Sequence, residues 1–573
     1  MYFRCKQVEF SRRQVIVQPA KASSHPFPRR VDEVHRGSLR SMTNYDIAII
    51  GGGLGGVAAA LAALRQGRRV FLSEQFDWIG GQLTSQAVPP DEHPWIERFG
   101  CTASYRKLRQ DVRQFYRDHY PLRPEVAALP EFNPGNGFVS TLCHEPRVSL
   151  AVLERYLLPY MGSGRLTLAK PYRPIEAKIE GSRIQSVRLQ HLHNQQEMEI
   201  RADYFVDATE IGDLLALANL PFRTGAEARS EFQEPSAPEV ADPNDVQSIS
   251  WCFIVDYDPE NAHTIEKPEQ WEKWRDYDPK LTPPWGSNML SWSATHPITL
   301  DPVIRTFDPI NPKPERGPMD LWTFRRIADK SNFTPGFYES DIVLVNWPQI
   351  DYLEGNLIGA DWKEQQRMLR DARQQSLCMF YWMQTEAPRP DGGKGWPGLR
   401  LRGDLTDGVE GLAMAPYIRE SRRIVGFETV TENHVGEDAR RNSEAPHRSH
   451  KFVDSIGVGA YRIDLHPSTA HKNYLDVGAL PFQIPLGSLF GPACDNLIAG
   501  CKNISTTHIT NGCYRLHPVE WNIGEAAGLL AHHCLEHKLL PKELREKEQQ
   551  IGQFQNFLVH CGVEIDWPEL TPL

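Results

Sequence analysis

The sequence predicts an α/β protein in which a domain built on a parallel sheet is interrupted by a second, α+β domain. The first observation is a unit of strand, glycine-rich turn, helix and strand at residues 45–74. The second is a change of character at residues 221 to about 410, where tryptophan and proline are dense and the alternation of strand and helix stops. The regular pattern returns from Pro481. We therefore expect a first domain made of residues 42–220 and 471–540, an inserted domain at 221–470 and a helical tail at 541–573.

The early unit has the spacing of a dinucleotide-binding site. Residues 47–50 form a short apolar strand, and the glycines that follow fill the three places of GxGxxG. Gly51 allows the tight turn, Gly53 lets a pyrophosphate approach the backbone, and Gly56 lets the helix pack closely on the strand. Glu74 ends the second strand about 20 positions after Gly53, where a carboxylate binds a ribose.

Other segments show the periodicity of helices and strands. We expect helices at 105–120, 146–161, 362–384 and 522–535, a β-meander at 166–189, and strands at 200–206 and 496–499. The basic helix at 105–120 is expected to present a solvated face. Gly524 and Gly528 allow close approach near the start of the last helix. The strand at 200–206 ends in a turn at the carboxyl edge of the sheet, where ligands bind in open α/β sheets.

Composition excludes several function classes. A formal net charge of −10 and a pI near 6.1 oppose a nucleic-acid surface. The ten cysteines show no CxxC spacing, so we expect neither a metal site nor an iron–sulfur centre, and a reduced, cytoplasmic protein. No apolar run approaches the roughly eighteen residues of a membrane span.

Several ordered blocks together resemble one known family. They include GGGLGG, WIGGQLTSQAVPPDEHPWIE, DATEIGDLLALANLPF, PFQIPLGSL and NGCYRLHPVEWNIGEAAG, spread from about residue 44 to about residue 560. The chain resembles the FAD-dependent oxidoreductase family whose members are distantly related to the flavin domain of heterodisulfide reductase. The expected fold is therefore a Rossmann-like, glutathione-reductase-type FAD-binding domain with an inserted substrate or cap domain.

The resemblance implies bound FAD and a set of residues that contact it. Glu210 stands where related flavoproteins carry the glycine of Ala-Thr-Gly. The start of the helix near residue 522 would suit the electron-rich edge of a reduced flavin. The expected cofactor-binding residues are Gly51, Gly53, Leu54, Gly55, Gly56, Glu74, Gln75, Gly80, Gly81, Gln82, Thr84, Ala208, Thr209, Arg515, Pro518, Asn522 and Ile523.

Two blocks carry side chains suited to substrate chemistry. Arg419 and Arg422 belong to a run of three guanidiniums that can hold carboxylates or phosphates. His466 is the first choice for general base, because imidazole titrates near neutral pH. In a strand, Tyr461 would not share a face with His466. The rival set, just before the last helix, is His508, Asn511, Arg515 and His517.

The expected function is two-electron, hydride-type redox chemistry on a small, polar or anionic organic substrate. The electron donor or acceptor is not specified by the sequence. One alternative is a flavin-dependent RNA-modifying enzyme, which the acidic balance opposes. A second alternative is a protein that uses FAD only as a structural prop, and anaerobic mixing with metabolites would distinguish it.

The first prediction concerns residues 1–41, which are rich in basic residues and show no hydrophobic period. We expect a disordered or mis-assigned leader. A chain shortened to begin at Met42 is therefore expected to fold, to bind FAD and to keep the thermal unfolding midpoint of the full chain. A clear drop in that midpoint, measured by circular dichroism, would show that the leader packs on the rest of the protein.

Overall fold

A computed structural model describes residues 44–568, so the expected leader lies outside the described residues. The chain begins with the predicted unit: β1 (Asn44–Ile50), α1 (Leu54–Arg65) and β2 (Val70–Ser73). Strands β1 and β2 are parallel, with Ile47 opposite Val70. The apolar side chains of both strands and nearly all of α1 are buried, as the sequence pattern predicts.

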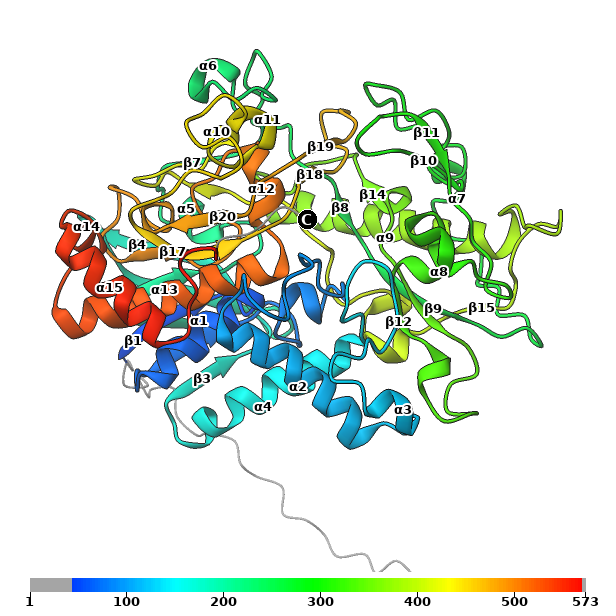
Figure 1. Cartoon of the computed structure of the whole chain (residues 1–573), viewed down its shortest axis with the longest axis horizontal. Helices are drawn as coiled ribbons and strands as arrows, with labels where there is room; N and C mark the ends of the chain where they lie inside the picture. The colour runs from blue at the N-terminus through cyan, green and yellow to red at the C-terminus, as the bar shows by residue number, and fades with distance from the viewer. Residues whose placement is uncertain (1–43, 569–573) are drawn as a thin grey trace, which may run out of the picture. The chain divides into compact units, whose positions relative to one another are not determined.

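The large sheet is of mixed type with a parallel core (Figure 1). Its order is β3-β2-β1-β6-β5-β4, with β21 also paired to β6. Strands β3 (Leu166–Ala169), β2, β1, β6 (Glu197–Asp207) and β21 (Leu497–Ala499) are parallel, whereas β4 (Tyr172–Glu180) and β5 (Arg183–His191) are antiparallel to their neighbours. Within the meander predicted at 166–189, the antiparallel pair β4 and β5 is confirmed, but β3 belongs to the parallel part.

The helix predicted at 105–120 does not present only a solvated face. It forms α2 (Ala103–His119), which packs beside α4 (Pro146–Gly162). Arg109 and Arg113 on α2 are buried. Both guanidiniums pair with Glu97, and Arg109 also pairs with Glu92. Buried arginines require such partners, which come from a loop that the helical period cannot reveal.

Between α5 (Asp213–Leu217) and β21, no described residue joins the large sheet. This segment instead forms a four-stranded antiparallel sheet of β12 (Arg326–Ala328), β13 (Ile342–Val345), β9 (Phe253–Tyr257) and β15 (Leu399–Leu401), with the long helix α9 (Trp362–Thr385). These green and yellow-green elements gather to the right in Figure 1, and the strands of the large sheet lie to the left.

The other elements are short or lie near the chain's end. The remaining helices are α3 (Pro124–Ala127), α6 (Arg229–Phe232), α7 (Trp271–Trp274), α8 (Leu321–Phe324), α10 (Glu432–Val435), α11 (Glu437–Arg440), α12 (His508–Tyr514), α14 (Pro541–Arg545) and α15 (Glu548–His560). The remaining strands form two-stranded sheets: β7 (Phe222–Arg223) with β16 (Arg423–Ile424), β8 (Ile249–Ser250) with β14 (Asp351–Tyr352), β10 (Ser293–Thr295) with β11 (Pro302–Ile304), β17 (Ser455–Gly459) with β20 (Phe482–Pro485), and β18 (Ile463–Leu465) with β19 (Leu475–Val477).

The last long helix returns to cover the first one. Helix α13 (His517–His537) begins five residues earlier than predicted, because Pro518 is tolerated in a first helical turn. It crosses α1 so closely that a Cβ atom on Gly524 would lie 2.0 Å from the Gly55 carbonyl oxygen. Gly528 meets the Ala59 carbonyl oxygen in the same way, at 2.3 Å. The predicted close approach of these small residues is confirmed, and its partner is α1.

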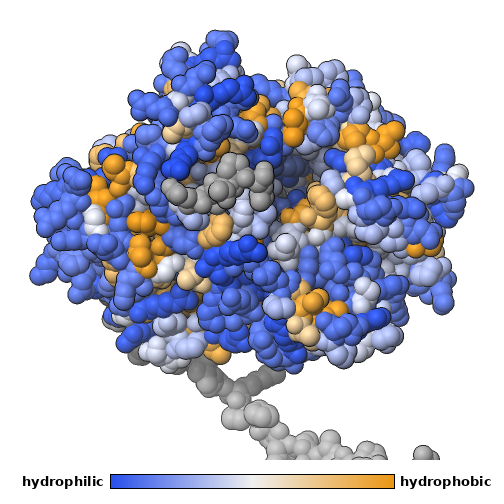
Figure 2. Space-filling model, in the orientation of Figure 1, coloured by the Kyte–Doolittle hydropathy of each residue, from blue (hydrophilic) through white to orange (hydrophobic). Residues whose placement is uncertain are grey.

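The face drawn in Figure 2 is largely hydrophilic, with small scattered hydrophobic patches. Across residues 44–568, no helix has the length and apolar character needed to cross a membrane.

The crossing of α1 and α13 predicts an unequal effect of two glycine substitutions. Gly524→Ala is expected to lower the free energy of unfolding by about 1–3 kcal/mol, because the added methyl group overlaps the α1 backbone. Gly552→Ala on α15 is the matched control, since no atom lies within 4 Å of its Cβ position. That control is expected to gain about 0.5–1 kcal/mol from helix propensity. Equal urea midpoints for the two variants would contradict this packing.

Candidate functional site

The glycine turn after β1 is built by close contacts between backbones. Gly51 has a φ of +103°, and a Cβ atom there would lie 2.1 Å from the Ala208 carbonyl oxygen at the end of β6. Gly56 approaches the Gly51 carbonyl oxygen equally closely, at 2.0 Å from its Cβ position. Because no side chain fits at either place, α1 begins directly at the carboxyl edge of the sheet.

The first turn of α1 faces a second glycine loop. Gly80, at a φ of +102°, donates its N–H to the Gly52 carbonyl oxygen at 2.8 Å. Gly81 starts the short 3-10 helix η1 (Gly81–Leu83), and its Cβ position is 3.1 Å from Gly53 Cα. Gly53 is the N-cap of α1 and has no side chain with which to cap it. The turn therefore offers backbone N–H groups and the positive end of a helix dipole to an anion.

Glu74 closes the other side of this turn. Its Oε2 accepts a hydrogen bond from the Gly52 N–H at 2.8 Å, and its Oε1 accepts one from the Phe76 N–H at 2.9 Å. Burial raises the pKa of Glu74 to about 7, although these backbone hydrogen bonds oppose the shift. Each oxygen keeps a lone pair, so the carboxylate is held in place and can still accept from ribose hydroxyls.

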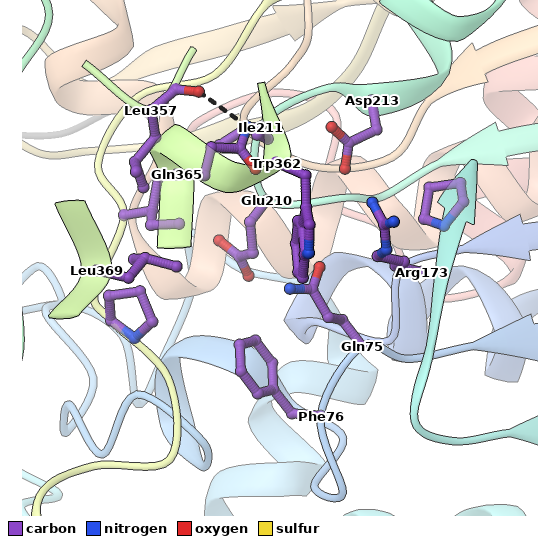
Figure 3. Close-up of a pocket in the computed structure, with 13 residues that line it drawn as sticks. Gln75, Phe76, Arg173, Glu210, Ile211, Asp213, Leu357, Trp362, Gln365 and Leu369 are labelled. Atoms are coloured by element: carbon purple, nitrogen blue, oxygen red, sulfur yellow. Dashed lines mark hydrogen bonds between the residues drawn. The ribbon is translucent and has the colours of Figure 1, made fainter. Parts of the chain in front are cut away.

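A cavity of about 100 Å³ lies beside the two residues that follow Glu74 (Figure 3). Gln75 and Phe76 line one side, and Trp362 comes from the start of α9. The Arg173 guanidinium lies 4.1 Å from the centre of the Trp362 ring. The cavity is thus lined by both the large sheet and the segment between α5 and β21, and its planar aromatic wall suits a flat ring.

The end of β6 forms the floor between the two glycine turns. The Asp207 carboxylate accepts hydrogen bonds from the Thr209 N–H and hydroxyl and from the Leu214 N–H, which fixes the turn into α5. Burial raises the pKa of Asp207 to about 7, with the Thr209 hydrogen bonds opposing it. Glu210 follows directly and lines the cavity of Figure 3.

The residues expected near the start of α13 fall into two groups. Arg515 donates to the Tyr417 hydroxyl at 3.1 Å and to the Asp464 carbonyl oxygen at 3.1 Å, while its own carbonyl accepts from Gln82 at 2.9 Å. Asn522 instead hydrogen-bonds the backbone of β17. Ile523 is buried in the core. Arg515 and Gln82 thus belong to one network, whereas Asn522 fixes α13 to its neighbour.

A second cavity, of about 570 Å³, lies beyond this network. Tyr461 and His466 both line it, together with Asp464. The expectation that Tyr461 would not share a face with His466 is wrong, because β18 spans only Ile463–Leu465 and strand alternation does not extend to residue 461. The cavity reaches the start of α13 through Asp91, whose N–H donates to His517 Nδ1 at 3.1 Å.

His466 is held by a buried carboxylate. Its Nδ1 lies 2.7 Å from Asp351 Oδ2, and its Nε2 lies 3.9 Å from Asp464 Oδ2. Asp351 also accepts from Ser250 at 2.5 Å and pairs with Arg419 at 3.2 Å. Burial alone would raise the pKa of Asp351, but Arg419 and His466 hold it below its ordinary value. An ionised Asp351 makes Nδ1 the donor and leaves Nε2 as an acceptor.

The three guanidiniums of residues 419–423 do not converge on one ligand. Arg419 is buried behind Asp351. Arg422 donates to the Ile211 carbonyl oxygen at 2.8 Å and lies 3.5 Å from Asp213, beside the smaller cavity. Arg423 is buried with Glu227 and Glu420. None of the three lines the 570 Å³ cavity.

The rival histidines also lie apart from that cavity's lining. His508 Nδ1 lies 3.0 Å from Glu420; burial alone would lower the pKa of His508, but Glu420 raises it. Burial lowers the pKa of His517 to about 4, and both of its ring nitrogens have backbone partners. Asn511 accepts a hydrogen bond from Gln247 at 3.3 Å.

Several residues that sequence reasoning did not single out line the larger cavity. Arg305 donates to the Pro318 carbonyl oxygen at 3.0 Å and, among residues 44–568, pairs with no carboxylate. Arg325 lies 3.4 Å from Asp91, and its buried Nε has no described partner. Asn346 is buried, and its Oδ1 likewise lacks a partner within the described chain. No spacing marks these residues, because they are isolated in an irregular segment.

The two cavities and the turn between them fit a dinucleotide that carries a redox ring. The glycine turn leaves room where any Cβ would clash, the Glu74 carboxylate bonds the N–H of Gly52 in that turn, and the next residue, Gln75, lines the smaller cavity. The 570 Å³ cavity is of the size that holds a small ligand.

Comparison with known proteins identifies the family. The model of the FAD dependent oxidoreductase family matches residues 46–558. No curated protein sequence matches the chain. Among solved structures, L-proline dehydrogenase from P. horikoshii is 18% identical with a TM-score of 0.16, over 32% of this chain and 24% of that one. Glycerol-3-phosphate dehydrogenase from Bacillus halodurans, complexed with FAD, is 12% identical with a TM-score of 0.21, over 38% of this chain and 40% of that one. The myxobacterial halogenase CndH is 16% identical with a TM-score of 0.21, over 39% of this chain and 45% of that one.

These structural overlaps span less than half of each solved chain, and at such TM-scores they do not bear on the substrate. The family match, in contrast, covers most of the sequence and includes the glycine turn, both cavities and α13. The chain therefore belongs to the FAD dependent oxidoreductase family, and FAD is its cofactor.

Proposed function

We propose that the protein carries out two-electron oxidation or reduction of a small, polar, anionic organic molecule in the 570 Å³ cavity. The observation that carries this proposal is His466, which lines the cavity and is held through Nδ1 by the buried Asp351. A histidine oriented by a buried carboxylate is the arrangement that general base catalysis requires.

The proposed path of FAD runs from the smaller cavity to the larger one. The adenosine would lie between Gln75 and Trp362, with its ribose on Glu74. The pyrophosphate would lie on the first turn of α1, between Gly53 and Gly81. The isoalloxazine ring would then border the 570 Å³ cavity, and the segment that lines this cavity would act as the cap domain of a glutathione-reductase-type fold.

The side chains of this protein would divide the chemistry as follows. Bound FAD would supply the acceptor for the hydrogen and electron pair of a substrate C–H bond during oxidation, or their donor during reduction. His466 Nε2 takes the proton from the substrate oxygen or nitrogen. Asp351 accepts from Nδ1–H and stabilises the imidazolium. Arg419 is a positioning residue, because it contacts Asp351 and not the cavity.

Unpaired polar groups in the cavity define the substrate class. The acids Asp464 and Asp476 have Arg515 and Arg462 as partners. Arg305 has no carboxylate partner within residues 44–568 and thus suits a substrate carboxylate. The orphaned Oδ1 of Asn346 suits a hydroxyl or amino donor. We therefore assign the anionic anchor to Arg305 in place of Arg422, and propose a hydroxy or amino acid as the substrate class.

We also propose that the protein works in a reducing compartment. The nine cysteines in the described range are free thiols, and eight of them are buried. Burial raises the pKa of Cys143 and of Cys252 to about 12, so these thiols stay protonated and unreactive at neutral pH.

Removing the Glu74 carboxylate tests the ribose assignment. Glu74→Ala is expected to weaken FAD binding by about 1.5–3 kcal/mol, the scale of a hydrogen bond to a charged group. Glu74→Gln keeps the size and is expected to lose less. Quenching of flavin fluorescence on titration gives the dissociation constants. Identical FAD affinity in all three proteins would place the ribose elsewhere.

Removing the imidazole tests the assignment of the base. With a substrate found by screening metabolites for anaerobic bleaching of the flavin, His466→Ala is expected to slow flavin reduction roughly 10²–10⁴-fold while FAD stays bound. The matched control is His471→Ala, because the His471 ring hydrogen-bonds the Pro279 carbonyl oxygen and lines neither cavity. Stopped-flow absorbance decides, and an unchanged rate in the His466 variant would return the role to His508 or His517.

The substrate anchor is tested by comparing two arginines. Arg305→Gln is expected to weaken binding of small hydroxy and amino acids by about 1.5–3 kcal/mol, the scale of a charge-assisted hydrogen bond. Arg422→Gln is expected to leave that affinity unchanged, since Arg422 lies beside the smaller cavity. Perturbation of the flavin absorbance on titration measures both. The reverse order of effects would restore Arg422 as the anchor.

A further inference from the structure

Two carboxylates lie on the first turn of α1, where the family match and the glycine spacing put the FAD pyrophosphate. Glu210 Oε1 lies 3.2 Å from the Cβ positions of both Gly53 and Gly81, which places it directly over the turn. Glu520 Oε1 accepts a hydrogen bond from the Gly55 N–H at 3.1 Å. A helix N-terminus attracts anions, so both carboxylates are stabilised there. A pyrophosphate brought to the same place would meet them as like charges.

A buried lysine lies close enough to both acids to feel their charge. Lys502 follows β21, its side chain is 1% exposed, and it forms an ion pair with Glu210 Oε2. Burial alone would lower the pKa of Lys502, but the negative charges of Glu210 and Glu520 hold it above its ordinary value. The lysine is therefore a fixed positive charge beside the turn. A buried cation requires a partner, so it cannot lose Glu210 unless another anion takes its place.

The carboxylates of Glu520 and Glu210 differ in how firmly they are held at the first turn of α1. Glu520 is held by the Gly55 N–H and by the Gln82 amide, and it is buried in the first turn of α13. The Glu210 side chain is 23% exposed and lines the cavity of Figure 3, as Trp362 and Gln75 do. Glu210 is therefore the acid of the two whose side chain reaches solvent.

We infer that Glu210 is a displaceable anion that occupies the pyrophosphate position on α1 and exchanges its place, and its ion pair with Lys502, for the FAD pyrophosphate. Lys502 then pairs with the phosphate oxygens, while Glu520 continues to cap Gly55. The exchange selects ligands that carry a pyrophosphate, because only an anion can replace Glu210 beside Lys502. It also gives Lys502 a partner both before and after FAD binds.

The test measures equilibrium binding of three probes to protein from which FAD has been removed. Isothermal titration with FAD, ADP and adenosine gives the dissociation constants. E210Q is expected to bind FAD and ADP about tenfold more tightly than the unchanged protein, because a like charge next to the pyrophosphate is removed. Adenosine lacks the pyrophosphate, so its affinity is expected to stay within about twofold.

A matched carboxylate serves as the control. Asp495 pairs with Lys542 at 2.6 Å and lines neither cavity. D495N is expected to change the affinity for FAD and for ADP by less than about threefold, as for a screened charge away from the phosphate. If D495N tightened binding as much as E210Q, the effect would be one of net charge and the inference would fail.

The role of Lys502 is tested in the E210Q variant, so that removing the lysine does not leave Glu210 as an unpaired charge. K502M alone leaves two acids without their cation, so E210Q/K502M is compared with E210Q, and circular dichroism checks that both are folded. The double variant is expected to bind FAD and ADP at least about tenfold more weakly than E210Q, with adenosine unchanged. Equal affinities in the two variants would overturn the role of Lys502.

Weaker binding of FAD and adenosine alike in E210Q would also overturn the inference, because it would mean that Glu210 contacts the cofactor directly. These measurements involve no substrate and no turnover. Their outcome is therefore independent of whether His466 is the base and whether Arg305 is the anchor.

Discussion

The first turn of α1 needs an anion that the helix does not supply. Glycine at the N-cap permits the close approach of neighbouring backbones, but it also leaves the turn without a capping side chain. Three segments far apart in the sequence enclose this turn: the end of β6 at Gly51, the loop at Gly80, and α13 at Gly55. Each contact is backbone to backbone, so the shape of the site is fixed by the sheet and the helix crossing. The charges on the turn come from elsewhere, through Glu210, Lys502 and Glu520.

The same turn is connected to the larger cavity by one hydrogen-bonded network. Gln82 in the second glycine loop accepts from the Tyr417 hydroxyl at 3.3 Å, and Tyr417 accepts from Arg515. Arg515 in turn donates to Asp464, which lies 3.9 Å from His466 Nε2. Members of this network come from the second glycine loop, from the residue that ends α12, and from the segment between α5 and β21. A cofactor that contacts Gln82 is therefore joined to the proposed base through four side chains, which gives a physical route for coupling the two ends of the site.

Local patterns predicted the parts of the site that are built from neighbouring residues. The GxGxxG turn, Glu74 and the parallel strands follow from spacing within about thirty residues, which is the length of one βαβ unit. His466 could be named as a candidate base because imidazole titrates near neutral pH, but its partner Asp351 is 115 positions away. Lys502 and Glu210 are 292 positions apart and meet only when β21 joins β6.

The cluster of arginines at residues 419–423 shows the opposite case. Arg419, Arg422 and Arg423 are neighbours in sequence, but they bond three different parts of the protein. Arg305, which does line the cavity, has no such cluster to mark it.

The central claim is that FAD spans from the cavity beside Glu74, over the first turn of α1, to the cavity that contains His466. An experimental structure of the FAD complex tests this most directly. The account predicts the adenine beside Trp362, the pyrophosphate over Gly53 with Glu210 turned away, and the isoalloxazine ring at the wall of the 570 Å³ cavity. An isoalloxazine ring outside that cavity, or a pyrophosphate bound away from α1 with Glu210 still over Gly53, would contradict it.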